Sequence, residues 1–155
     1  MSDAYSADSL VVLVGPPGSG KSTAARCWPS AARVSLDAYR ALCTGSEADQ
    51  TANVEARVIQ RLIISTRLER GLPVVVDSTN TSEDTRASLL RLARHHGREA
   101  HAVLLDTPLA ACLARNAARA RRVPEAVIRA KHAEMPSRAA LLAEGFATAT
   151  LWSAR

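Results

Sequence analysis

Short apolar runs alternate with longer segments of helical periodicity along the whole chain. The runs are rich in valine and leucine without polar alternation, which is typical of strands buried on both faces of a sheet. Strands are predicted at residues 10–14, 33–36, 74–76, 102–105 and 147–152. Helices are predicted at residues 21–28, 37–43, 47–70, 82–97, 108–120 and 126–135. This alternation predicts a three-layer α/β fold, with a mostly parallel five-stranded sheet and helices on both faces.

Three aspartates directly follow predicted strands: Asp37, Asp77 and Asp106. In open parallel sheets, ligands bind in the crevice at the carboxyl ends of the strands. Lys21 begins the helix after the first strand and therefore lies at the same edge of the predicted sheet. We expect the three carboxylates to face one cleft together with the Lys21 ammonium group.

Length and composition fit one domain over residues 1–155, because 155 residues with 47% hydrophobic content can build one core. Residues 1–9 are polar and lack the basic and apolar regions of a signal peptide. No stretch approaches the roughly 20 apolar residues of a membrane span. We therefore expect a cytoplasmic protein without membrane contact. The three cysteines are scattered, which gives no support to a disulfide framework or a zinc site.

Residues 15–23, between the first strand and the first helix, read Gly-Pro-Pro-Gly-Ser-Gly-Lys-Ser-Thr. They match the pattern G-x-x-x-x-G-K-[ST], in which glycines let successive backbone N–H groups turn toward a phosphate. Lys21 can reach the outer phosphates of ATP, and the Ser22 hydroxyl suits Mg²⁺. A glycine-rich turn with a chance lysine is the alternative, but strand, loop and helix stand in the required order. The residues predicted to bind ATP here are Gly15, Gly18, Ser19, Gly20, Lys21, Ser22 and Thr23.

Asp37 and Arg40 form a second candidate element, because a spacing of three places them on one face of the predicted helix 37–43. Asp37 could accept the proton of an attacking hydroxyl group, while Arg40 holds a negative group of the acceptor. Tyr39 between them is a candidate for substrate contact. A helix N-cap aspartate in a local ion pair with arginine explains the same spacing.

Asp77 ends the run Val74-Val75-Val76-Asp77, a buried strand followed by a carboxylate that can hold Mg²⁺ directly or through water. Ser22 and Asp77 are therefore the predicted metal ligands. Ser78 and Thr79 are typical of a capping turn. Asn80 is a further candidate for substrate binding.

The net charge of +5 suggests an anionic partner, although an arginine-rich and alanine-rich chain can also reflect biased genomic composition. Four arginines fall within eight residues: Arg115, Arg119, Arg121 and Arg122. Three of them recur at spacings of four and three, on a helix leading into a lid at about residues 113–135. Guanidinium groups that close over ATP could neutralise charge on the transferred phosphoryl group. A solvated basic helix face is the alternative. Val123 beside the lid is a candidate for packing on a terminal base.

Four motifs, in order over about four fifths of the chain, resemble those of the 5′-polynucleotide kinase branch of P-loop phosphotransferases. They are the loop at 15–22, Asp37-x-x-Arg40, the run 74–80 and Arg115-Asn-x-x-Arg119-x-x-Arg122-Val-Pro-Glu125. The resemblance implies a P-loop kinase fold with a helical lid. It implies that Asp37 is the base for a 5′-hydroxyl group and that Arg40 contacts a phosphate of the acceptor. It also implies that Arg115 and Arg119, with Arg122 beside them, engage the phosphates of ATP.

The activity implied by the resemblance is Mg²⁺-dependent transfer of the γ-phosphate of ATP to a nucleic acid 5′ end. Many family members carry a phosphatase or ligase on the same chain; here such repair enzymes are expected to be separate proteins. Two other functions stay open: a kinase of a small hydroxylated metabolite or antibiotic, and an ATP-gated binding module. The choices between RNA and DNA and between ATP and GTP, and the oligomeric state, stay open as well.

Overall fold

The sheet of the computed structural model, which describes residues 5–6 and 8–152, contains five strands in the order β2-β3-β1-β4-β5. Their bounds, in this order, are Arg33–Val34, Val74–Val76, Leu10–Val14, Ala100–Leu104 and Thr148–Leu151. In the register of the central strand, Leu10 pairs with Val74 on one side and with Ala100 on the other. Every neighbouring pair is parallel, which confirms the prediction of a five-stranded, mostly parallel sheet.

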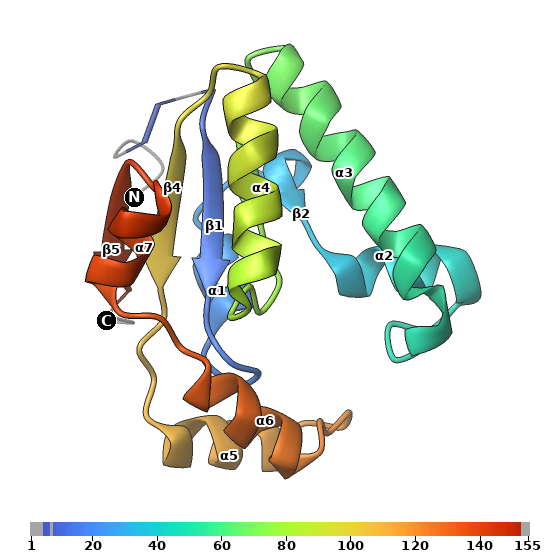
Figure 1. The fold of residues 1–155 in the computed structure, drawn as a ribbon. Coiled ribbons are helices and arrows are strands. Elements are labelled where there is room, and N and C mark those ends of the chain that lie inside the picture. The colour runs from blue at the N-terminus through green and yellow to red at the C-terminus, as the bar shows by residue number, and fades with distance from the viewer. Residues whose placement is uncertain (1–4, 7, 153–155) are drawn as a thin grey trace.

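Helices flank the sheet and extend beyond the ends of its strands. Figure 1 shows α4 in front of β1, α3 and α2 at the outer side near β2, and α5 and α6 together beyond the arrowheads of β1 and β4. Their bounds are α1 Lys21–Ala25, α2 Leu36–Thr44, α3 Asn53–Glu69, α4 Glu83–His95, α5 Leu109–Ala117, α6 Glu125–Ala133 and α7 Arg138–Glu144. Two 3₁₀ turns, η2 Ser30–Ala32 and η3 Gln50–Ala52, complete the described elements.

The core divides between the two faces of the sheet because successive strand side chains point in opposite directions. On one face, alternate residues of β1 that begin with Leu10 pack with apolar residues of α3, α4 and α7. On the other face, Val11 and Leu13 pack with Ala24 and Ala25 of α1 and with Trp28. The predicted three-layer arrangement is therefore confirmed.

The segment after α2 differs from the prediction of one helix over residues 47–70. Gly45, with φ of 79°, ends α2, and the Asp49 carboxylate accepts a hydrogen bond from the backbone N–H of Thr51. Arg40 also donates from Nε to the carbonyl oxygen of Glu47 at 2.9 Å. These side-chain bonds hold residues 45–52 as a turn, so α3 begins only at Asn53.

Helix α7 lies in a segment for which no helix was predicted. Ser137 caps it by accepting a hydrogen bond from the backbone N–H of Ala140, and Gly145 ends it with φ of 109°. Both are ordinary helix-end residues, so the boundary signals were present in the sequence.

The carboxyl ends of the parallel strands define one edge of the sheet. At this edge β1 leads into the loop at residues 15–20, β2 into α2, and β3 into Asp77. In the part of the chain that the structure describes, no helix is both long and apolar enough to cross a bilayer.

Candidate active site

The loop between β1 and α1 has a backbone that requires glycine at two positions. Gly18 has φ of 85°, and a Cβ atom there would lie 2.5 Å from the backbone oxygen of Cys112 on α5. Gly20 has φ of 101° and occupies the N-cap position of α1. Residues other than glycine rarely adopt these φ angles. The two glycines therefore allow the loop to pack closely on α5 and to direct its N–H groups toward the start of α1.

Lys21 extends back along this loop. Its Nζ atom donates hydrogen bonds to the carbonyl oxygens of Gly15 and Pro16, each at 2.8 Å. Burial lowers the pKa of the Lys21 ammonium group to about 8, against the opposing effect of the nearby Asp77 carboxylate. The side chain is thus held at the position where the phosphates of a nucleotide would meet the loop.

Asp77 and Ser22 lie next to each other and fit the chemistry of a magnesium site. Burial raises the pKa of the Asp77 carboxyl group, while the Ser22 hydroxyl and the Lys21 ammonium group act in the opposite direction. The backbone N–H of Asp77 donates to Val34 of β2 at 2.8 Å, which fixes the turn after β3. Hydroxyl and carboxylate oxygens are the ligands that Mg²⁺ prefers, usually with water and substrate phosphates.

Arg40 holds Asp37 at the α2 side of the site. Its side chain is 7% exposed, and all three guanidinium nitrogens donate hydrogen bonds. Nη2 donates to the Asp37 carboxylate, Nε to the Glu47 carbonyl oxygen at 2.9 Å, and Nη1 to Asn53 Oδ1 at 3.0 Å. Ser35, and not Asp37, is the N-cap residue of α2, so the capping half of the alternative is wrong, whereas its local ion pair is present.

A cleft of about 930 Å³ brings most of the predicted site residues together. Its walls come from the glycine-rich loop, α2, the turn before η3, the end of β3 and the lid segment between α5 and α6. The predicted residues that line it are Gly18, Gly20, Lys21, Ser22, Asp37, Arg40, Asp77, Arg119, Arg122 and Val123.

The lid segment, residues 118–124 between α5 and α6, is held by Asn116, which stands in the predicted arginine motif but was assigned no role. Asn116 is 4% exposed, and its amide donates to the Val123 carbonyl and accepts from the Val123 N–H, both at 2.9 Å. This pair of bonds closes the segment on itself and presents Arg119 and Arg122 to the cleft.

Arg115 has a different place from the other lid arginines. Its Nη1 donates to the carbonyl oxygens of Gly18 and Ser19, both at 3.3 Å, and it does not line the cleft. Arg115 therefore braces the glycine-rich loop from the α5 side.

Three predicted contacts fall away from the cleft. Tyr39 is 8% exposed and packs in the core, where burial raises the pKa of its hydroxyl group. Asn80 is 3% exposed, and its amide donates to backbone carbonyls, including that of Leu13 at 2.8 Å. Asp106 is exposed outside the cleft lining. Tyr39 and Asn80 are thus buried away from the cleft lining, and their contact with a substrate stays a prediction.

Three of the residues predicted to bind nucleotide are not among those that line the cleft: Gly15, Ser19 and Thr23. Ser19 is 3% exposed, with its Oγ atom 3.5 Å from Lys21 Nζ. Thr23 lies on the first turn of α1, exposed but outside the lining. Their contribution to nucleotide binding stays a prediction.

Glu47 and Arg121 line the cleft, but sequence reasoning assigned them no role. Arg121 Nη1 lies 3.6 Å from Glu47 Oε2 and 3.8 Å from Asp37 Oδ2. Arg121 belongs to the arginine cluster, but it does not share the helical spacing of Arg115, Arg119 and Arg122. Glu47 was placed inside a predicted helix, where an exposed glutamate gives no functional signal.

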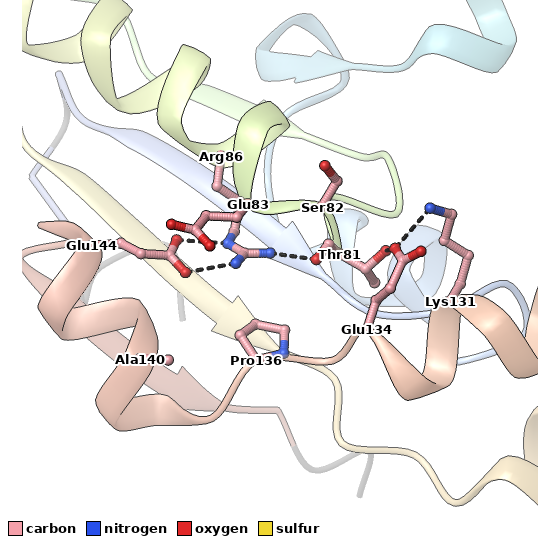
Figure 2. A pocket seen from close by; sticks show the side chains of 9 residues that line it. All are labelled: Thr81, Ser82, Glu83, Arg86, Lys131, Glu134, Pro136, Ala140 and Glu144. Atoms are coloured by element: carbon pink, nitrogen blue, oxygen red, sulfur yellow. Dashed lines mark hydrogen bonds and ion pairs between the residues drawn. The ribbon is translucent and has the colours of Figure 1, made fainter.

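A second group of charged residues braces the loop after β3 from behind (Figure 2). Arg86 is 3% exposed and donates to the carbonyl oxygens of Asn80 at 3.1 Å and Thr81 at 2.6 Å. It also forms two hydrogen bonds with the Glu144 carboxylate, at 2.7 and 2.6 Å. Figure 2 shows Glu134 of the turn after α6 accepting from Thr81, at 3.1 Å. The loop that carries Asp77 is thus tied to α7 and to the end of α6.

Comparisons with known proteins show a family and a fold for this chain. A family model described as an AAA domain, AAA_33, matches residues 10–142. The chain is 31% identical over 110 residues to transcription factor bHLH140 of Arabidopsis thaliana, a match that spans 71% of this chain and 11% of that protein.

Two solved structures have a similar fold. A chain in the structure of the Pnkp1/Rnl/Hen1 RNA repair complex superposes with a TM-score of 0.72 at 20% identity, over 82% of this chain and 43% of that one. A gluconokinase from Sinorhizobium meliloti 1021 superposes with a TM-score of 0.55 at 18% identity, over 94% of this chain and 82% of that one.

The family match covers the glycine-rich loop, the Asp37–Arg40 pair, Asp77 and the lid. All of these parts lie within the matched residues. The chain therefore belongs to the AAA domain family of the AAA_33 model and has the fold of P-loop kinases.

Proposed function

We propose that the protein transfers the γ-phosphate of ATP to the 5′-hydroxyl end of a polynucleotide. The observation that carries this proposal is the Asp37–Arg40 pair, which lines the same cleft as Lys21. A carboxylate fixed by an arginine, and close enough to Lys21 to influence its pKa, suits a general base facing the γ-phosphate.

The reaction requires one bond to form and one to break. The acceptor oxygen attacks the γ-phosphorus, its proton passes to Asp37, and the bond from the γ-phosphorus to the bridging oxygen of ADP breaks. Lys21 and the loop N–H groups hold the donor phosphates, and Arg119 and Arg122 offset charge on the transferred group. Mg²⁺, held through Ser22 and Asp77, would neutralise part of the charge on the phosphates.

The likeness to a chain of the RNA repair complex supports a nucleic acid acceptor and separate partner enzymes such as a phosphatase or ligase. The basic lid supports the same acceptor, because arginines bind the phosphates of a nucleic acid backbone. The affinity of such binding falls as the salt concentration rises. A small hydroxylated acceptor is the second candidate. The gluconokinase likeness favours it, because that match extends over most of both chains.

The base assignment is tested with Asp37→Asn. We expect kcat on a 5′-hydroxyl oligonucleotide to fall by about 10²- to 10⁴-fold, the usual contribution of a general base, while ATP affinity changes little. Glu55→Gln, on the exposed face of α3, removes a carboxylate outside the cleft and is the matched control. Equal losses of kcat and ATP affinity in Asp37→Asn would contradict the assignment.

The two candidate acceptors are separated by a panel that contains 5′-hydroxyl RNA, 5′-hydroxyl DNA and small hydroxylated acids and sugars. Phosphorylation of a small compound alone would replace the proposed acceptor. Release of free phosphate without any phosphorylated acceptor would favour an ATP-gated binding module.

A further inference from the structure

Arg121 joins the lid to the α2 side of the cleft. It lies in the segment between α5 and α6, whereas Asp37 lies on α2 and Glu47 in the turn that follows. The distances from Arg121 Nη1 to the two carboxylates, 3.6 and 3.8 Å, are ion-pair distances without a hydrogen bond. The bridge is therefore held by charge alone.

Arg40 and Arg121 differ in what they can offer a ligand. Each guanidinium nitrogen of Arg40 already donates a hydrogen bond inside the protein, and its side chain is 7% exposed. The two N–H groups that remain, one on each Nη atom, belong to this nearly buried side chain, so Arg40 offers a phosphate less than Arg121 does. The Arg121 side chain is 42% exposed and makes only long ionic contacts in the cleft. A phosphate that bears a full charge and forms short hydrogen bonds can displace such contacts.

We propose that Arg121 is the residue that binds the acceptor's phosphate, and that Glu47 competes with this phosphate for Arg121. Arg40 then acts as a positioning residue that orients Asp37. The inference rests on the proposed polynucleotide acceptor. It assigns the recognition of that acceptor to the contact between Arg121 and a phosphate. An acceptor with a phosphate near its hydroxyl group releases Arg121 from Glu47 and Asp37, whereas a neutral acceptor leaves the bridge in place.

The expected effects follow from how strongly each contact is held. Loss of a charged hydrogen bond in Arg121→Gln raises the acceptor KM by about ten- to a hundredfold. Glu47→Gln lowers this KM by about two- to fivefold, because partly exposed ion pairs are weak. The KM for ATP stays within about twofold in both variants, because neither side chain is assigned to the ATP phosphates. Arg121→Lys restores part of the lost affinity because it keeps the charge.

The test is steady-state kinetics of the full chain with a 5′-hydroxyl oligonucleotide, and with the matching nucleoside without phosphate. Arg129→Gln is the control, because Arg129 lies on α6 outside the cleft lining and its Nη2 atom lies 3.6 Å from Glu125 Oε2. In binding titrations against salt, Arg121→Gln reduces the slope of log Kd against log salt by about 0.7, the value for one single-strand phosphate contact. Arg129→Gln leaves that slope unchanged.

An unchanged acceptor KM in Glu47→Gln overturns the inference. So does a large KM increase in Arg40→Gln with none in Arg121→Gln, which would return the phosphate contact to Arg40. An equal response of the nucleoside and the oligonucleotide overturns it as well. If the unaltered protein phosphorylates no oligonucleotide, the proposed function fails and the inference falls with it. If the unaltered protein phosphorylates the oligonucleotide but the Arg121 and Glu47 variants behave like Arg129→Gln, the inference alone fails.

Discussion

The low pKa of Lys21 predicts that ATP affinity depends on pH above neutrality. Burial brings this pKa to about 8 in the ligand-free cleft, so the ammonium group begins to lose its proton near that pH. Phosphate oxygens favour the charged form, so the pKa rises when ATP binds. Binding above pH 8 must then take up a proton, and affinity must fall as pH rises. No such fall is expected between pH 6 and 7 from Lys21.

The size of the effect follows from the protonated fraction. A pKa of about 8 leaves roughly nine tenths of Lys21 charged at pH 7 and about one tenth at pH 9. The Kd for ATP should therefore be about tenfold higher at pH 9 than at pH 7. Isothermal titration calorimetry at these pH values, repeated in buffers of different ionisation enthalpy, measures both the affinity and the proton uptake.

Lys21→Met is the matched control, because it keeps an unbranched side chain and removes the titrating group. Its affinity should be low and independent of pH over this range. The reasoning is refuted if the unaltered protein binds ATP equally well at pH 7 and 9 without proton uptake. It is also refuted if Lys21→Met shows the same pH dependence.

Three further predictions concern the framework. Gly18→Ala should weaken ATP binding and lower the free energy of unfolding by about 1–2 kcal/mol, because the φ angle of Gly18 is 85° and the new Cβ atom would meet the Cys112 backbone. Calorimetry measures the Kd for ATP and thermal unfolding measures the stability. An unchanged Kd would contradict the loop geometry. Glu144→Ala should cost about 3–5 kcal/mol in denaturant unfolding, because it leaves the Arg86 charge buried without its carboxylate; a loss below 1 kcal/mol would show that Arg86 reaches solvent. Burial lowers the pKa of His101 from 6.5, so the stability that this group contributes is present above pH 6.5 and declines as the pH falls below 6.5. His101→Gln should flatten this decline in the free energy of unfolding. An equal decline in the variant would assign it to other groups.

The parallel strands and the glycine-rich loop were accessible from the sequence because both depend on local signals. Buried valine runs predict parallel strands, and a glycine-rich loop before a helix has few other uses. Parallel strands bring their carboxyl ends to one edge, so Lys21, Asp37 and Asp77 could be placed in one cleft before the structure was known.

The remaining site contacts depend on long-range packing that local patterns do not encode. Tyr39 was assigned to substrate by its place between Asp37 and Arg40, but the turn of α2 carries it into the core. The bridge from Arg121 to Glu47 joins residues on two separate loops. Its formation depends on Arg40 holding the turn before η3, a contact that no sequence spacing predicts.

The central claim is that this cleft transfers phosphate to a polynucleotide 5′ end. The most direct test incubates the protein with γ-labelled ATP, Mg²⁺ and a 5′-hydroxyl oligonucleotide, digests the product, and locates the label, with Lys21→Ala and Asp37→Ala in parallel. We predict label on the 5′-terminal nucleotide alone, and none with either variant. Label only on a small acceptor or in free phosphate, or label transfer that survives both substitutions, would contradict the account.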